Sequence, residues 1–113
     1  MIAEYLKDHG AMGPENAIPA GTIAKDLGLQ RESVVKQVGI ERRKGILICA
    51  SNTGYGGYFM PVDIADIITQ RDRLEHEVNS RLATLEPFQC AVHAYMLAGN
   101  EEKGGVDFEK LSD

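Results

Sequence analysis

The sequence predicts a mainly α-helical protein with one small β-hairpin and a long helix near the C-terminus. Apolar residues recur at the three- and four-residue spacing of amphipathic helices in residues 2–9, 20–27, 31–44 and 62–86. Two apolar runs flank the turn-rich sequence SNTGYG, at residues 46–50 and 57–60, as expected for the strands of a hairpin. Glycines and prolines separate most of these segments from one another.

The second and third predicted helices are expected to be joined by a tight turn at Gly28. Glycine adopts the left-handed conformation at little cost and is therefore common where a helix ends. In the third helix we expect Val34, Val35 and Val38 to form a buried stripe. Gly45 is expected to end this helix after a run of three cationic residues.

The long helix predicted for residues 62–86 has an apolar seam, which we interpret as a dimerisation surface. The seam comprises Ile64, Ile67, Ile68, Leu74, Val78, Leu82 and Leu85. Arg71 and Arg81 interrupt the seam, so the pattern differs from an uninterrupted leucine zipper. The seam could fold back on the rest of the chain, or it could pair with a second chain. We favour a homodimer, because three short helices offer little surface to cover such a seam.

Pro87 is expected to end the long helix, so that residues 88–97 form a separate helix. The polar, glycine-rich residues 99–113 are expected to form a flexible tail. The chain is thus predicted to consist of a domain of residues 1–61, a helical extension of residues 62–98 and this tail.

Positive charge is concentrated in one segment of the chain. The net charge is −5 at pH 7, yet residues 22–45 hold six Lys and Arg residues against three Asp and Glu residues. A local basic patch can bind nucleic acid even on an acidic protein. No apolar run approaches the roughly 18–20 residues that span a bilayer, and the first residues lack the apolar region of a signal peptide. We therefore expect a cytoplasmic protein.

Residues with catalytic or metal-binding chemistry do not cluster in the sequence. His9, His76 and His93 lie on separate predicted helices without a nucleophile beside them. Cys90 and His93 have the spacing of half a metal site, but no second pair accompanies them. Cys49 lies in an apolar run and is expected to be a small core residue. We expect no enzyme activity, cofactor, metal or small-molecule substrate.

The order helix, link, helix, tight turn, helix and hairpin is that of a winged helix-turn-helix. In this fold the helix after the turn enters the major groove of DNA, so we predict sequence-specific binding of double-stranded DNA by residues 31–44. The candidate contact residues are Gln30, Arg31, Glu32, Ser33, Lys36, Gln37, Arg43 and Lys44. Cationic side chains suit phosphates or guanine, and glutamine suits adenine. Alternatively, the basic residues 42–44 are only a solvated helix end.

The hairpin loop is expected to act as the wing, although it carries no charge. Its hydroxyl and amide side chains can donate hydrogen bonds to phosphates. The candidates are Ser51, Asn52, Thr53 and Tyr55. Alternatively, the glycines only shape the turn, while Tyr55 and Tyr58 cover the core.

The segment IAKDLGLQRESVVKQV, followed by RRKGILI and GYGGYFMP, resembles the winged-helix DNA-binding domain of the biotin repressor group. Residues 41–59, ERRKGILICASNTGYGGYF, are more similar to small phage- and prophage-encoded winged-helix proteins, in which a long polar helix follows. The resemblance covers residues 2–86 and implies a transcription regulator of the phage type. Glu41 stands where the biotin repressor has a buried leucine, and biotin chemistry is not implied.

A second function of another class stays open, namely a winged-helix scaffold that binds a protein and not DNA. The acidic net charge, the uncharged loop and Glu32 on the presumed reading face favour this alternative. It predicts no salt-dependent affinity for DNA, and an acidic long helix as the binding surface.

Overall fold

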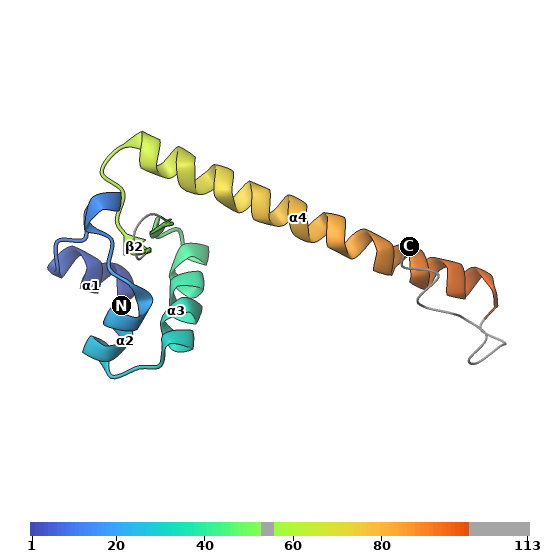
Figure 1. The fold of residues 1–113 in the computed structure, drawn as a ribbon, viewed down its shortest axis with the longest axis horizontal. Coiled ribbons are helices and arrows are strands. Elements are labelled where there is room, and N and C mark those ends of the chain that lie inside the picture. The colour runs from blue at the N-terminus through green and yellow to red at the C-terminus, as the bar shows by residue number, and fades with distance from the viewer. Residues whose placement is uncertain (53–55, 100–113) are drawn as a thin grey trace. The chain divides into compact units, whose positions relative to one another are not determined.

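The computed structural model describes residues 1–52 and 56–99, in two compact units that meet between Asp72 and Arg73. The elements in chain order are α1 (Ile2–Asp8), the 3-10 helix η1 (Pro14–Asn16), α2 (Ala20–Leu27), α3 (Arg31–Arg43), β1 (Cys49–Ser51), β2 (Gly57–Phe59) and α4 (Ile64–Leu97) (Figure 1). The prediction of a mainly helical chain with a small hairpin and a long C-terminal helix is confirmed.

Helices α2 and α3 pack against each other on either side of the predicted turn. Gly28 ends α2 with φ 67° and ψ 33°, in the left-handed region where other residues are strained. Its two neighbouring helices bury the residues that face each other, Ile23 and Ala24 on α2 and Val34 and Val38 on α3. The helix–turn–helix pair is therefore held by burial on both sides of one glycine.

An apolar core joins the three short helices to the hairpin in the first unit. Helix α1 contributes Ile2 and Leu6, which have no exposed surface, and the chain beside the hairpin contributes Ile48 and Met60. Removing such side chains from water stabilises the fold by about 25 cal/mol for each Å² of apolar surface. Cys49 is buried beside this cluster, as predicted for a small core residue.

A polar contact ties α1 to α2 at the edge of the core. The hydroxyl of Tyr5 donates a hydrogen bond to the carboxylate of Asp26. Burial and this hydrogen bond raise the pKa of Tyr5 to about 12, so its hydroxyl remains a donor at neutral pH. The ring of Tyr5 stacks on His9, with 4.0 Å between the ring centroids.

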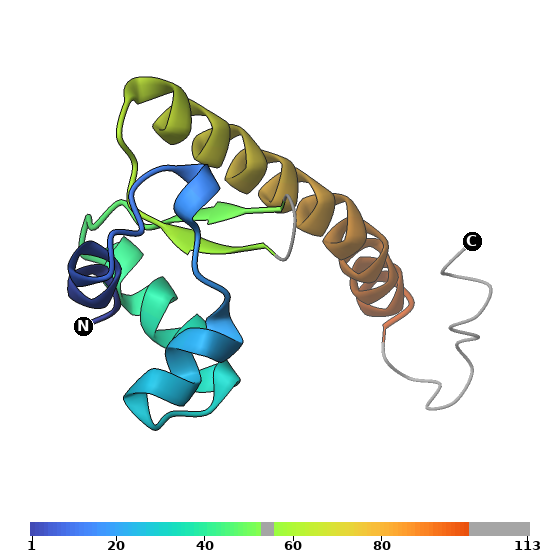
Figure 2. The same ribbon diagram turned by 60° about the vertical axis from the view of Figure 1, so that its left-hand side comes forward.

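Strands β1 and β2 form an antiparallel hairpin (Figure 2). In its register Ala50 pairs with Tyr58. The first strand begins at Cys49, whereas the sequence predicted residues 46–50. The amide of Ile46 instead donates to the carbonyl of Glu41, and so completes the end of α3. Residues 46–48 connect the helix to the strand, so the strand begins three residues later than predicted.

The second strand also pairs with the chain that leads into α2. Ile18 and Tyr58 exchange two backbone hydrogen bonds of 2.9 Å each. Gly57 has φ 125°, and a Cβ atom there would lie 2.5 Å from the carbonyl carbon of Ile18. Only glycine permits this close approach. The sequence predicted an extended link here, but not its pairing with the hairpin.

Helix α4 begins at Ile64, because two aspartates cap its first turn. The carboxylate of Asp63 accepts from the amide of Asp66 at 3.1 Å, and the carboxylate of Asp66 accepts from the amide of Val62 at 3.0 Å. In the following turn Gln70 accepts from the amide of Ala50 at 2.8 Å, which joins α4 to β1 within the first unit.

The predicted break at Pro87 is wrong, because α4 continues through this residue to Leu97. A proline inside a helix removes one backbone hydrogen bond and costs about 3 kcal/mol. The neighbouring Leu85, Glu86 and Gln89 are good helix formers, and helix continues on both sides. None of the helices in residues 1–52 and 56–99 is long and apolar enough to cross a membrane. The tail predicted from residue 99 lies, apart from Gly99, outside the described residues.

Candidate nucleic-acid interface

Helix α3 presents most of the predicted DNA-contact residues on its exposed side. At about 100° per residue, Glu32, Lys36 and Arg43 lie opposite the buried Val34 and Val38. The predicted residues with exposed side chains are Gln30, Arg31, Glu32, Ser33, Lys36, Arg43 and Lys44. The side of α3 opposite the buried valines therefore carries two cations, Lys36 and Arg43, and one carboxylate, Glu32, while Arg31 and Lys44 lie at the two ends of the helix.

Arg43 lies along this face next to the only glycine inside α3. A Cβ atom at Gly39 would lie 3.3 Å from Nη1 of Arg43. A glycine within a helix costs about 1 kcal/mol relative to alanine. Here it leaves space for the guanidinium group close to the helix surface, and α3 continues past it to Arg43.

Gln37 differs from the other predicted DNA-contact residues because its side chain is half-buried and makes a hydrogen bond within the protein. Its Nε2 donates to Oε2 of Glu41 at 3.0 Å. Glu41 also accepts from the backbone amides of Ile2 at 2.9 Å and Ala3 at 3.1 Å. These amides belong to the first turn of α1, where helical N–H groups have no acceptor within the helix. In this arrangement the Gln37 amide supports the contact of α1 with α3.

Glu41 is a charged residue with only 3% of its surface exposed. Burial by itself would raise the pKa of Glu41, but hydrogen bonds from Ile2, Ala3, Gln37 and the Met1 amino group outweigh it and lower the pKa below 4.5. The carboxylate therefore stays charged at neutral pH. Sequence reasoning missed this role, although the spacing from Val38 places Glu41 on the buried stripe.

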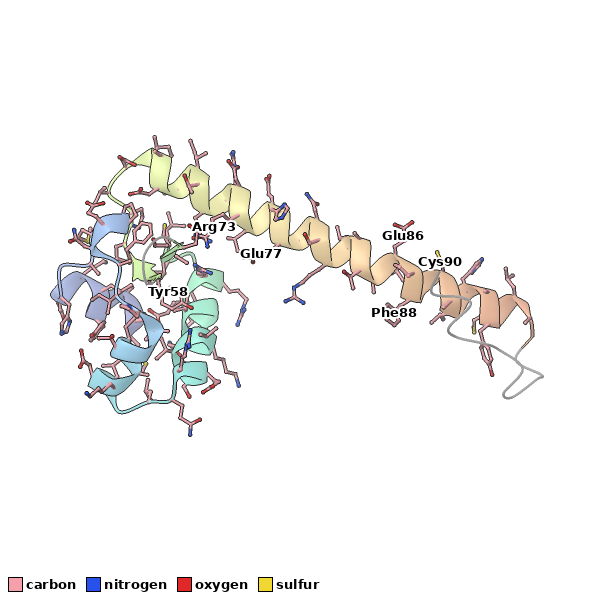
Figure 3. All side chains as sticks on the ribbon, in the orientation of Figure 1. Tyr58, Arg73, Glu77, Glu86, Phe88 and Cys90 are labelled. Atoms are coloured by element: carbon pink, nitrogen blue, oxygen red, sulfur yellow. The ribbon has the colours of Figure 1, made fainter. Side chains whose placement is uncertain are left out.

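An open hollow of about 670 Å³ lies between α2, α3 and the hairpin. Its walls include Thr22 near the start of α2, Arg31 and Val35 of α3, and Ser51 and Tyr58 of the hairpin. Tyr58, labelled in Figure 3, also packs against the core, in agreement with the alternative role for this tyrosine. The hollow joins the exposed side of α3 to the hairpin.

The N-terminus of α2 borders the same hollow. Its N-cap residue is Pro19, which provides no side-chain hydrogen bond to the helix. Ala20 and Gly21, the first two residues of α2, line the hollow. Uncapped amides and the helix dipole make a helix N-terminus a favourable place for a phosphate group.

Two of the four predicted wing residues, Ser51 and Asn52, lie within the described part of the hairpin. Ser51 is half-buried and lines the hollow, and Asn52 is exposed. The predicted wing residues Thr53 and Tyr55 lie outside the described residues. The charged groups of the candidate interface thus come from α3 and its two ends.

Val35 corrects the predicted buried stripe of α3. Its side chain is 50% exposed, whereas Val34 and Val38 are buried. The reason is the helical period, because Val34 and Val38 are one turn apart while Val35 is rotated from Val34 by about 100°. Sequence reasoning missed Val35 of α3 and Thr22 of α2, which both line the hollow. A stricter use of the helical period would have predicted that Val35 is exposed.

Helix α4 carries the predicted dimerisation seam, and none of its residues is buried. Ile67 is half-buried, and the other six seam residues are between 38% and 67% exposed. Exposed apolar residues continue past Pro87 with Phe88, Val92 and Met96, which the predicted break had separated from the seam. Figure 3 shows Phe88 on the opposite side of α4 from Glu86 and Cys90.

Comparisons of the chain with models of protein families, with curated proteins and with solved structures found no match. In residues 1–52 and 56–99, no group of three or more His, Cys, Asp and Glu side chains could hold a metal ion.

Proposed function

We propose that this protein is a winged helix-turn-helix that binds double-stranded DNA sequence-specifically, as a transcription regulator of the phage type. The observation that carries the proposal is the exposed face of α3, where Lys36 and Arg43 lie opposite the buried valines. Helix α3 follows α2 after a glycine turn and precedes the hairpin, which is the order of elements that presents such a helix to the major groove.

The proposed contacts divide into those that position DNA and those that read it. Arg31 and the N-terminus of α2 border the hollow and would hold the phosphate backbone, with Ser51 and Asn52 as hydrogen-bond donors from the hairpin. Lys36 and Arg43 have long cationic side chains that can reach phosphates or the edge of guanine.

We also propose that α4 pairs with α4 of a second copy of the chain. Most of its apolar residues are exposed, and helices in proteins gain most of their stability from packing an apolar face against a partner. Arg71 and Arg81 interrupt the seam, so a parallel pair in register would place each arginine beside the same arginine of the second copy. An antiparallel pair separates each arginine from its own copy. A symmetric dimer would supply two copies of α3 to one DNA site.

The test of DNA binding is the affinity for a labelled duplex of random sequence at low salt, measured by fluorescence anisotropy. The test variant is Lys36→Ala/Arg43→Ala. The matched control is Lys7→Ala/Lys25→Ala, which removes the same charge from exposed positions on α1 and α2. We expect the test variant to lose at least about tenfold in affinity, because each phosphate contact contributes electrostatic binding energy.

The control variant should keep most of the wild-type affinity, since its two lysines belong to α1 and α2 and not to α3. Equal losses in the two variants would show that net charge alone determines binding. The absence of binding by the wild type at low salt would contradict the proposal.

A second candidate function is a scaffold that binds another protein. The observations that favour it are Glu32 on the exposed face of α3 and the exposed apolar residues of α4. This function predicts that removal of Lys36 and Arg43 does not weaken the binding of the partner, and that a different protein, not a second copy of the chain, covers the α4 seam.

A further inference from the structure

Val35 is an apolar residue on the otherwise polar exposed side of α3. It is 50% exposed and lines a small hollow with Arg31 and Glu32, as well as the larger hollow beside the hairpin. Arg31 precedes it by one helical turn, so the two side chains lie on the same side of α3. Its methyl groups are therefore accessible at the proposed DNA surface.

The stability of the first unit does not explain a valine at this position. Val34 and Val38 already fill the space between α3 and the core, with at most 2% of their surface exposed. A β-branched residue on an exposed helix face has lower helix propensity than alanine. The exposed half of this side chain is therefore available for a contact outside the chain.

We infer that Val35 determines sequence specificity by contacting the C5-methyl group of a thymine in the major groove. This inference rests on the proposed DNA-binding function and names one of its base contacts. The thymine methyl is the apolar group that a base pair presents in the major groove, and apolar side chains recognise it by contact. Arg31, one turn earlier and at the edge of the hollow, would hold the adjacent phosphate and so place Val35 against the base.

The experiment first selects binding sites for the wild type from a randomised duplex library. Each thymine of the selected site is then replaced singly by uracil, which removes the C5-methyl group and keeps the base pairing. Affinities are measured for the wild type, for Val35→Ala and for the control Val62→Ala. Val62 is 57% exposed and lies outside α3, so its truncation also removes two methyl groups from an exposed valine.

At one thymine position we expect uracil to weaken wild-type binding about fourfold, the effect of one buried methyl group. The Val35→Ala variant should bind the thymine site about as weakly as the wild type binds the uracil site, and should show no further loss with uracil. The Val62→Ala variant should keep the full fourfold sensitivity.

The results that overturn the inference differ from those that overturn DNA binding. A selected site at which no uracil replacement weakens the wild type, or at which Val35→Ala keeps the wild-type sensitivity, would overturn the role of Val35 and leave the proposed function intact. Failure of the library to yield any enriched site would overturn both.

Discussion

The first unit, up to Asp72, and the part of α4 that begins at Arg73 differ in how far their apolar side chains are exposed to solvent. In the first unit, side chains such as Ile2, Leu6 and Val34 are completely buried against one another. In α4, apolar residues of similar size are exposed, and none is buried. The first unit therefore stabilises itself, whereas α4 has an apolar surface suited to a partner.

The two regions also differ in what they present outward. The exposed side of α3 is cationic at Arg31, Lys36 and Arg43, while that of α4 combines an apolar seam with several carboxylates. A cationic helix face suits a polyanion, and its binding should weaken with salt. An apolar seam suits another helix, and its association should depend little on salt.

The largest effect should come from a charge placed in the α4 seam. Replacement of Leu85 by Asp should weaken self-association by at least about 100-fold, because each copy loses the burial of a leucine and gains an unpaired charge. Sedimentation equilibrium of the wild type, Leu85→Asp and the control Asn79→Asp would measure this, since Asn79 is a polar residue of the same helix. A wild-type chain that stays monomeric at every concentration would contradict the expected dimer.

Removal of the buried carboxylate should affect the first unit alone. We expect Glu41→Ala to lower the free energy of unfolding by about 3 kcal/mol, because the amides of Ile2 and Ala3 lose their acceptor while remaining buried. Glu32→Ala removes an exposed glutamate from the same helix and should change stability by less than about 0.5 kcal/mol. Urea unfolding of both variants would test this, and equal effects would refute the role of Glu41.

The same carboxylate should make the stability of the first unit depend on acid. Because the folded pKa of Glu41 lies below 4.5, its contribution is present above that pH and is lost as the pH falls through the folded pKa. Wild type and Glu41→Gln should therefore differ by a constant amount near neutral pH and converge in acid. Thermal melts of the two proteins from neutral to acid pH would test this, and a difference in stability that stays constant down to acid pH would contradict the role of the carboxylate.

A smaller effect is expected where α3 begins. Gln30 is the N-cap residue and makes no side-chain hydrogen bond to the helix. Replacement by Ser should raise the free energy of unfolding by about 1 kcal/mol, because its hydroxyl can accept from a free amide of the first turn. If Gln30 contacts a phosphate, the same variant should bind DNA slightly more weakly. Equilibrium unfolding would measure the stability, and fluorescence anisotropy would measure the affinity for DNA. An unchanged free energy of unfolding would contradict the expectation that the first turn of α3 lacks a cap.

Local signals in the sequence predicted the helix–turn–helix pair well. Gly28 marks the turn, and the one-turn spacing of Val34 and Val38 marks the buried side of α3. The cationic exposed side follows from the same period. These features depend on neighbouring residues, and for that reason a single sequence reveals them.

Features that depend on distant residues could not be predicted in the same way. The acceptor role of Glu41 requires the amide of Ile2, which is 39 residues away in the sequence. The close approach at Gly57 requires the pairing of Tyr58 with Ile18. At Pro87 the local rule that a proline ends a helix was wrong, because helix continues on both sides of the proline.

The central claim, that α3 contacts DNA through its cationic face, is tested most directly by the salt dependence of binding. The slope of log affinity against log salt reports the number of phosphates contacted. We predict that Lys36→Ala/Arg43→Ala has a slope shallower than wild type by about 1.8 for each bound chain, if both residues contact phosphates. Lys7→Ala/Lys25→Ala should keep the wild-type slope. Identical slopes for all three proteins, or no binding at any salt concentration, would contradict the claim.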